Sequence, residues 1–307
     1  MSQPDLRVSM PGFTMKNPVT TASGTFGYGS EFAPYMDIAQ LGALTVKALT
    51  LEPRDGNSGR RLIETPAGLI NSIGLMNPGL DVFVRSILPE LRLQENLPLI
   101  VNISGSSVAE YAAIAERLEA ETGIAALEVN ISCPNVKEGG MAFGHRPETA
   151  TEVTAAVRAK TKLPMFVKLT PNTGDIGSIA QAVEAAGADG LSLINTVLAM
   201  AIDLYTRRPV LDGTMGGLSG PAIMPIALSM VYRVHQRCRL PIIGMGGIST
   251  WQDAVQFILA GASAVAVGTA NFVNPTATVD IIAGLQTWCE QQNIASISEI
   301  VGAAHTA

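Results

Sequence analysis

The sequence contains few cysteines. Its three, Cys133, Cys238 and Cys289, lie far apart in a chain of 307 residues. A disulfide framework uses paired spacings, so we expect reduced thiols in a cytoplasmic protein. An iron–sulfur cluster normally takes four thiolates, so this chain cannot hold one by itself.

Charge is also scarce. Charged residues make up 15% of the chain, compared with about 25% in average soluble proteins. We therefore expect either that subunit contacts cover much of the surface or that the core is unusually large. The net charge of -6, without any run of lysines or arginines, argues against a nucleic-acid partner.

The sequence lacks the signals of a membrane or secreted protein. Its first residues, MSQPDLRVSMPG, do not combine a basic region with an apolar core, so we expect no signal peptide. Residues 254 to 273 carry no charge over a length that could span a membrane. Gly261, Gly268 and Asn271 interrupt this stretch, which predicts the core of an α/β fold and no membrane contact.

Short apolar segments recur along the chain with room for a helix between them, as in a parallel sheet. The predicted strands are Pro18 to Ala22, Leu44 to Ala48, Leu99 to Ser104, Ala126 to Ile131, Met165 to Leu169, Gly190 to Asn195, Ile242 to Gly246 and Ala264 to Gly268. The predicted helices are Glu31 to Leu41, Asp81 to Leu91, Val108 to Glu121, Glu148 to Lys160, Asp175 to Ala186, Ala222 to Gln236, Thr250 to Leu259 and Thr276 to Gln291.

This pattern predicts an α/β fold of the (β/α)8 TIM barrel type, with a doubly wound sheet as the weaker alternative. A short N-terminal β-hairpin, Leu6 to Val8 with Phe13 to Met15, is expected to plug the N-terminal mouth of the barrel. Asp175 and either Ser249 or Thr250 are expected N-caps, with Gly187 and Gly261 at helix ends. No linker divides the chain, so we expect residues 1–307 to form one domain.

Polar residues gather at the predicted strand ends. In such barrels the active site lies at the C-terminal ends of the strands. The residues at or just after these ends are Ser23, Lys47, Asn102, Asn130, Cys133, Lys168, Asn195, Thr196, Gly246, Gly247, Gly268 and Thr269. Loops are polar in any protein, but ordinary loops are mixed and mostly charged, whereas these residues are amides, glycines and single lysines. These residues therefore predict a single site at one mouth of the barrel.

Cys133 is the candidate catalytic group. It follows a predicted apolar strand and precedes Pro134, which disfavours helical backbone at the cysteine and places the thiol at a strand-to-loop corner. The alternative is a buried thiol that packs as a small hydrophobe. Asn130 and Asn135 favour a site, because unpaired amides are costly to bury and suit a polar, planar ligand.

Glycines follow the last two strands in the segments GMGGIST and VGTANF. Glycines in these loops let backbone amides approach an anion, so we expect a phosphorylated ligand. GMGG lacks the last glycine of the dinucleotide fingerprint, which argues against a nicotinamide site. Lys47 and Lys168 would face the mouth, where either could balance an anionic substrate or a reduced cofactor; a solvated strand-end lysine is the alternative.

Taken together, the motifs resemble those of the dihydroorotate dehydrogenases, and most closely the class 1B catalytic subunits. The resemblance covers nearly the whole chain. It rests on TASGTFGYG, VKALTLEPRDGN, NSIGLMNPG, NISCPNVKEGG, VKLTPN, INTVLAMAIDLYTRRP, GGLSGPAI and the two glycine loops. It implies an FMN-containing barrel that oxidises (S)-dihydroorotate to orotate in pyrimidine biosynthesis. The residue at Cys133 would remove a proton from C5 while a hydride passes from C6 to FMN, with residues 136–144 as a candidate lid.

The resemblance also implies which residues bind each ligand. Dihydroorotate or orotate would contact Lys47, Asn71, Ser72, Ile73, Gly74, Leu75, Asn130, Asn195 and Thr196. FMN would contact Ser23, Lys47, Ala48, Asn102, Asn130, Lys168, Ile194 and Gly220, with its phosphate on Gly246, Gly247, Gly268 and Thr269. No metal is expected, because His145, His235 and His305 lack the spacing of a metal site.

The electron acceptor separates the remaining alternatives. The chain offers neither a nicotinamide fold nor cysteines for a cluster, so a partner must pass electrons to NAD+. The class 1B resemblance implies a partner subunit with FAD and a 2Fe-2S cluster, in a heterotetramer around a homodimer of this chain. A class 1A enzyme that uses fumarate, another FMN barrel acting on a pyrimidine, and a non-catalytic barrel that binds a phosphorylated ligand are the alternatives.

Overall fold

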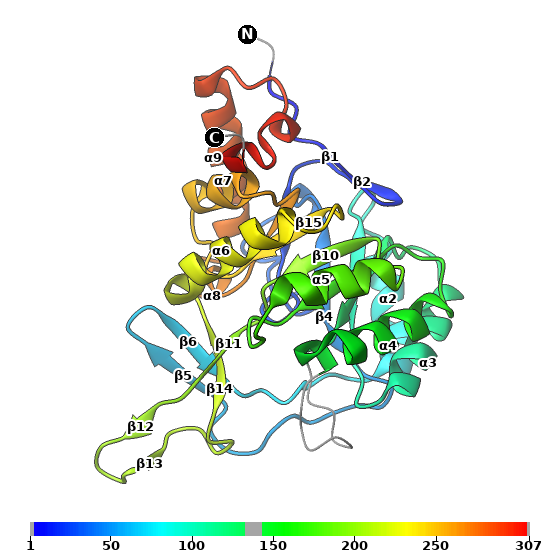
Figure 1. Ribbon diagram of the computed structural model, residues 1–307, viewed down its shortest axis with the longest axis vertical. Coiled ribbons are helices and arrows are strands. Elements are labelled where there is room, and N and C mark those ends of the chain that lie inside the picture. Colours follow the sequence, from blue (N-terminus) through cyan, green and yellow to red (C-terminus); the bar gives the residue numbers. More distant parts are fainter. Residues whose placement is uncertain (1–2, 133–142, 306–307) are drawn as a thin grey trace.

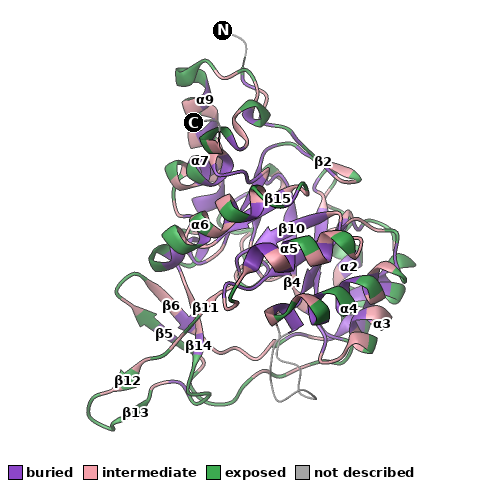
Figure 2. Cartoon of the chain, viewed as in Figure 1, coloured by how far each residue is buried: buried purple, intermediate pink, exposed green. Residues whose placement is uncertain are grey.

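The computed structural model describes residues 3–132 and 143–305. Its centre is an eight-stranded parallel sheet in the order β3-β16-β15-β10-β9-β8-β7-β4, whose strands lie among the surrounding helices (Figure 1) and are buried (Figure 2). The strands are β3 (Val19–Thr21), β4 (Leu44–Leu49), β7 (Leu99–Ile103), β8 (Ala126–Asn130), β9 (Met165–Leu169), β10 (Gly190–Leu193), β15 (Ile242–Met245) and β16 (Ala264–Val267). Each predicted strand is confirmed, with ends that shift by at most two residues.

The sheet closes into a barrel where β3 meets β4. The Thr45 amide donates to Thr21 Oγ1 at 3.1 Å, and that hydroxyl donates to the Thr45 carbonyl at 3.0 Å. The Gly42 amide donates to the Val19 carbonyl at 2.9 Å. A side-chain hydroxyl therefore replaces part of the backbone ladder at the seam. Closure confirms the TIM barrel and excludes the doubly wound sheet.

Helices cover the outside of the barrel, with buried inner faces and exposed outer faces (Figure 2). They include α3 (Val108–Glu119), α4 (Pro147–Arg158), α5 (Ile176–Ala185), α6 (Met224–His235), α7 (Trp251–Leu259) and α9 (Ala277–Gln292). Asp175 caps α5, and Thr250 forms a capping box with Asp253 at α7. Gly187 and Gly261 follow these two helices with φ of +97° and +115°. The predicted caps are confirmed, and Thr250 rather than Ser249 is the N-cap of α7.

The helix predicted from Glu31 to Leu41 is wrong. This segment holds only a 3-10 turn, η1 (Ile38–Gln40), which Asp37 caps by accepting from the Ala39 amide. Pro34 lacks an amide hydrogen, and Asp37 offers the backbone a turn that competes with a helix.

The helix predicted from Asp81 to Leu91 is confirmed in extent but not in type. It runs from α1 (Leu80–Val82) through the π-helical η2 (Phe83–Ile87) to α2 (Leu88–Leu91). Pro89 has no amide to donate to the carbonyl four residues before it, and the Leu88 amide instead donates to the Phe83 carbonyl. The widened turn follows from that missing donor.

The N-terminal hairpin is present, with its first strand two residues later than predicted. It consists of β1 (Val8–Met10) and β2 (Phe13–Met15), joined by a turn in which Gly12 has φ of +78°. The Phe13 ring meets the buried Phe166 ring edge-on at 6.3 Å. The hairpin thus packs against the N-terminal end of β9, as expected for a plug.

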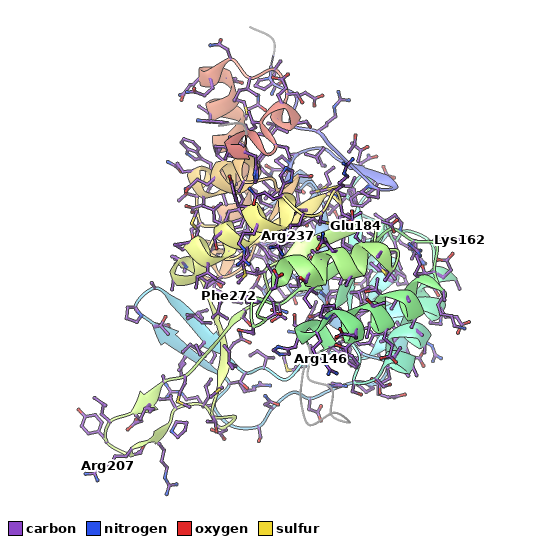
Figure 3. The ribbon with its side chains drawn as sticks, viewed as in Figure 1. Arg146, Lys162, Glu184, Arg207, Arg237 and Phe272 are labelled. Carbon is purple, nitrogen blue, oxygen red and sulfur yellow. The ribbon has the colours of Figure 1, made fainter. Side chains whose placement is uncertain are left out.

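A second sheet projects from the barrel, and the sequence analysis missed it. Its antiparallel order is β11-β14-β6-β5. The strands are β5 (Leu62–Thr65), β6 (Gly68–Asn71), β11 (Val197–Ala199) and β14 (Gly216–Ser219), and a small extension adds β12 (Ile202–Asp203) and β13 (Arg208–Pro209). We call residues 62–71 and 197–219 the arm; Arg207 lies at its tip (Figures 1 and 3).

Within the described ranges, no helix is long and apolar enough to cross a membrane. The uncharged stretch from 254 to 273 instead contributes to α7, forms β16 and continues into α8 (Ala270–Val273). This confirms its assignment to the core.

Candidate active site

Four buried side chains form a closed ring inside the barrel, and we call Ser23, Asn102, Glu128 and Lys168 the buried ring. Asn102 Nδ2 donates to Ser23 Oγ at 3.2 Å and to Glu128 Oε1. Lys168 Nζ donates to the same Ser23 oxygen at 3.2 Å and lies 3.6 Å from Glu128 Oε1. None of the four residues is more than 5% exposed. Burying the two charged groups of this ring is tolerable in a low-dielectric interior because they are paired with each other and hydrogen-bonded.

Strand register brings the ring together. Asn102 on β7 lies opposite Glu128 on β8, and Lys168 on β9 lies opposite Asn130. Ser23 follows β3, whose end reaches the same mouth. The strand-end rule found three of these residues and missed Glu128, because Glu128 lies within the predicted strand Ala126 to Ile131 and not at its end. In a barrel both faces of a strand are buried, so a single acidic residue within an apolar strand must be buried too. That residue was the signal in the sequence that could have revealed Glu128.

The substrate residues predicted at the strand ends are linked by amide contacts. Asn195 Nδ2 donates to Asn130 Oδ1 at 3.2 Å, and Asn195 Oδ1 accepts from the Thr196 amide at 2.8 Å. Asn71 Nδ2 donates to the Gly217 carbonyl at 3.1 Å. A Cβ at Gly217 would lie 2.0 Å from Thr196 Oγ1, so Thr196 packs directly on the strand that pairs with Asn71.

Two residues without a predicted role hold the backbone of Asn130 and Thr196 in place. The Tyr111 hydroxyl donates to the Asn130 carbonyl at 2.6 Å. Asn172 Nδ2 donates to the Thr196 carbonyl at 3.0 Å, and its Oδ1 accepts from the Leu198 amide at 2.9 Å. Asn172 ends the VKLTPN motif, so its position was visible in the sequence but its contact with the arm was not.

Lys47 reaches the mouth through a bulge in β4. The register with β7 runs from Val46 opposite Val101 to Leu49 opposite Ile103, so β4 carries one extra residue around Lys47 and Ala48. A bulge re-aims side chains at the rim of a barrel. Burial lowers the pKa of the Lys47 ammonium, an effect that the Glu31 carboxylate opposes. Lys47 therefore differs from a solvated strand-end lysine.

The predicted substrate segment from Asn71 to Leu75 follows β6 and is held by hydrogen bonds from Asn57. Asn57 Nδ2 donates to the Ser72 carbonyl and hydroxyl, both at 3.0 Å, and the Asn57 amide donates to the Ile73 carbonyl at 3.0 Å. Gly74 and Leu75 have φ of +76° and +56°. A left-handed leucine is uncommon and costs about 1 kcal/mol or more, so the neighbouring contacts must hold it.

The glycine loops and the β14 end meet beside the ring. Gly246 and Gly247 have φ of +123° and +82°. A Cβ at Gly247 would lie 2.8 Å from the Gly220 carbonyl, and one at Gly246 would lie 3.3 Å from Ile194 Cγ1. Thr269 Oγ1 donates to Ser219 Oγ at 2.8 Å. The structure thus brings Ile194 and the predicted phosphate residues together.

Gly268 lies against the residues that follow β3. A Cβ there would lie 3.4 Å from Ala22 Cβ, next to Ser23. The last barrel loop therefore lies beside the buried ring. Cys133 lies outside the described residues, as does most of the candidate lid, and the thiol's role stays a prediction.

Two other cysteines are buried in the described structure, and His305 packs against an aromatic ring. Cys238 and Cys289 are buried, and burial raises the pKa of the Cys238 thiol to about 11. His305 stacks on Tyr232 with ring centroids 3.9 Å apart. The part of the chain that the structure describes holds no cluster of His, Cys, Asp or Glu able to bind a metal ion.

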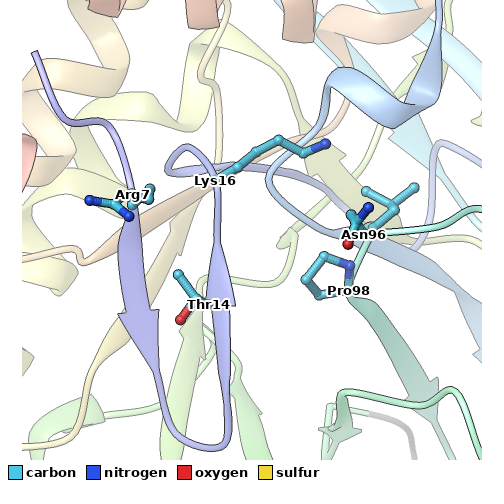
Figure 4. Close-up of a pocket in the computed structure, with 6 residues that line it drawn as sticks. Arg7, Thr14, Lys16, Asn96 and Pro98 are labelled. Carbon is cyan, nitrogen blue, oxygen red and sulfur yellow. The ribbon is translucent and has the colours of Figure 1, made fainter. Parts of the chain in front are cut away.

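A cavity of about 410 Å³ lies at the hairpin, at the opposite end of the barrel (Figure 4). Arg7 and Lys16 line it, but Arg7 pairs with Asp5 at 2.7 Å and Lys16 donates to the Ala39 carbonyl. Its cations are engaged, and it is separate from the candidate active site.

Comparison with known proteins identifies the family. The family model described as dihydroorotate dehydrogenase matches residues 5–288. The chain belongs to the dihydroorotate dehydrogenase family. Three relatives are named dihydroorotate dehydrogenase B (NAD(+)), catalytic subunit. The one from Desulforamulus reducens is 59% identical over 98% of this chain and 99% of its own. Those from Desulforudis audaxviator and Geotalea uraniireducens are 57% and 51% identical, over 97% and 100% of both chains.

These matches confirm the resemblance to dihydroorotate dehydrogenases that the motifs predicted. They run through the barrel and the arm alike, so the family includes the elements that the sequence analysis did not anticipate. The relatives' name favours class B over the fumarate-using class.

Proposed function

We propose that this chain is the catalytic subunit of an NAD+-linked dihydroorotate dehydrogenase, which oxidises (S)-dihydroorotate to orotate in pyrimidine biosynthesis. The observation that carries the proposal is the single mouth where the buried ring, the amides of Asn130 and Asn195, and the glycine loops meet. Relatives of matching length that bear this name support it.

The residues at this mouth fit FMN. Asn102 Oδ1 is buried and has no hydrogen-bond partner among the described residues, which leaves an acceptor for a ligand N–H. Gly220, Gly246 and Gly247 have positive φ, as close approach of backbone to a phosphate requires. We assign the cofactor to Ser23, Lys47, Ala48, Asn102, Asn130, Lys168, Ile194 and Gly220, with its phosphate on Gly246, Gly247, Gly268 and Thr269. Bound FMN would supply the hydride acceptor.

The substrate would bind above the buried ring. Its ring presents N–H and C=O groups that match asparagine amides, and its carboxylate needs a cation. We assign it to Lys47, Asn71, Ser72, Ile73, Gly74, Leu75, Asn130, Asn195 and Thr196. The mutual bonds of Asn130, Asn195 and Thr196 orient these amides before substrate arrives.

Cys133 is the proposed general base that takes the proton from C5. A thiol has a reference pKa of about 8.5, close enough to working pH for proton abstraction. Residues 136–144, most of which lie outside the described ranges, remain the proposed lid.

The proposed partner is an electron-transfer subunit with FAD and a 2Fe-2S cluster, in a cytoplasmic heterotetramer around a homodimer. The words "catalytic subunit" in the relatives' name support a partner for them. The arm supports a subunit contact, because Leu204 and Tyr205 are 84% and 97% exposed. We further propose one domain over residues 1–307, since the main apolar core extends from Leu6 to Ile297.

Turnover with different acceptors tests this proposal. The FMN-loaded chain should reduce NAD+ only when the candidate partner subunit is added, and fumarate should not replace the pair. Efficient turnover of the isolated chain with fumarate would favour the class 1A alternative. Reaction with uracil or thymine but not orotate would favour another pyrimidine-directed barrel.

A further inference from the structure

Glu128 has no part in the ligand assignments above, although it is the one anion of the buried ring. Its side chain is 2% exposed and lies between the Asn102 amide and the Lys168 ammonium. A buried carboxylate is costly unless it is paired and hydrogen-bonded. Its place beneath the cofactor residues therefore calls for a function.

The first consequence concerns the Asn102 amide. Asn102 Nδ2 donates both to Glu128 Oε1 and to Ser23 Oγ. If the amide were turned over, Asn102 Oδ1 would face the Glu128 carboxylate, and two acceptors would repel each other. Glu128 therefore decides which end of the amide is left without a protein partner, and that end is the acceptor Oδ1.

The second consequence concerns charge. Lys168 Nζ lies 3.6 Å from Glu128 Oε1, and the two side chains are 7% and 2% exposed. Opposite charges at this distance in a buried site largely cancel each other's field. A ligand beside the ring therefore meets an ion pair rather than a free lysine cation. Lys47, which is in no ion pair within the described residues, remains a cation that a ligand at the mouth can meet.

We propose that Glu128 is a positioning residue for bound FMN, which fixes Asn102 as an acceptor and neutralises Lys168, so that the midpoint potential is lower than Lys168 alone would set. This inference rests on the proposed function, because it concerns the flavin assigned to the site. Reduced flavin carries more negative charge than oxidised flavin, so an unbalanced cation beside it would stabilise the reduced form.

The test is the midpoint potential of FMN bound to Glu128→Gln. Glutamine has the same size and retains an acceptor for Asn102, but it removes the charge. We expect reduced FMN to gain about tenfold in binding relative to oxidised FMN, which raises a two-electron potential by about 30 mV. Adding Lys168→Gln to this variant should return the potential toward the wild-type value.

Asp189→Asn is the matched control. Asp189 pairs with Arg158 at 2.8 Å beside the start of β10, at the other end of the barrel. The same chemical change there should leave the flavin potential unchanged. A structural effect of losing any ion pair would move both variants, whereas the proposed effect moves only Glu128→Gln.

The outcomes separate this inference from the function on which it rests. An unchanged or lower potential in folded, FMN-bound Glu128→Gln would overturn the role of Glu128. If Glu128→Gln does not take up FMN, the potential of FMN bound to Glu128→Asp, which keeps the charge, is measured instead. A wild-type potential in Glu128→Asp supports the charge role. Loss of FMN from Glu128→Asp as well refutes that role. Wild-type protein that binds no FMN would instead refute the proposed function.

Discussion

Two lysines reach the candidate site, and their surroundings give them different roles. Lys168 is held in the buried ring by Ser23 and Glu128. Lys47 sits on a bulge at the rim, where burial lowers the pKa of its ammonium group. We therefore expect Lys47, rather than Lys168, to attract the substrate carboxylate.

The pH dependence of substrate binding tests this role. Because the pKa of Lys47 is lowered, its charge is lost at a lower pH than that of an exposed lysine, below about 10.5. We expect KM for dihydroorotate to rise as pH increases through that lowered pKa, by about 10- to 100-fold, the effect of losing one charge-assisted hydrogen bond. In Lys47→Arg the guanidinium stays charged, so the rise should be absent. An equal rise in both proteins would assign it to another group.

Removal of the thiol tests the proposed base. We expect Cys133→Ala to keep FMN and to lose turnover by about 10²- to 10⁴-fold, the usual contribution of a general base. Cys133→Ser should fold as well and remain slow near neutral pH, because a hydroxyl is far harder to deprotonate. The control is the FMN content of each variant, measured by absorbance. Near-normal turnover in Cys133→Ala would refute the assignment.

At the scale of elements, the loops after β15 and β16 depend on backbone that only glycine adopts easily. Gly247→Ala would place a Cβ 2.6 Å from Met224 Cβ at φ of +82°. Strain of about 1–3 kcal/mol should weaken FMN binding by roughly 5- to 150-fold. A fluorescence titration of the FMN-free protein measures this effect.

Gly174→Ala is the control for that loop. A Cβ there meets nothing within 4 Å, so FMN affinity should stay at the wild-type value. Equal affinities for both variants would show that the phosphate does not lie against Gly247.

The barrel could be predicted from the sequence because each strand and most helices carry their own local pattern of apolar residues and caps. Asn102 and Lys168 were found because parallel strands end at one mouth. Glu128 was missed because it lies within a buried strand, whereas the site was predicted only from residues at the strand ends. The arm was missed because its short strands pair residues about 150 positions apart, Gly217 with Asn71, which no local pattern reveals.

For the whole molecule, the arm carries a group of exposed large apolar side chains. Leu198, Ile202, Leu204 and Tyr205 all lie on it, and the same sheet ends at Asn71 in β6 and begins just after Thr196 in β11. Exposed side chains of this size mark an interface. We therefore expect the arm to contribute to the homodimer.

Sedimentation velocity can test this contact. We expect Leu204→Ser combined with Tyr205→Ser to weaken dimerisation by about 10- to 100-fold, the effect of losing roughly 1.4 to 2.8 kcal/mol. Leu93→Ser is the control, because Leu93 is also 77% exposed but follows α2, away from the arm. A dimer unaffected by the arm variant would place the interface elsewhere.

If the proposed function is right, dihydroorotate reduces a flavin held at this barrel mouth. Anaerobic addition of (S)-dihydroorotate to the FMN-loaded chain, followed by flavin absorbance, measures this reaction. We expect bleaching in a single turnover, with orotate formed in equal amount to reduced flavin, and bleaching slowed in Cys133→Ala. Flavin that dithionite bleaches but dihydroorotate leaves oxidised would contradict it.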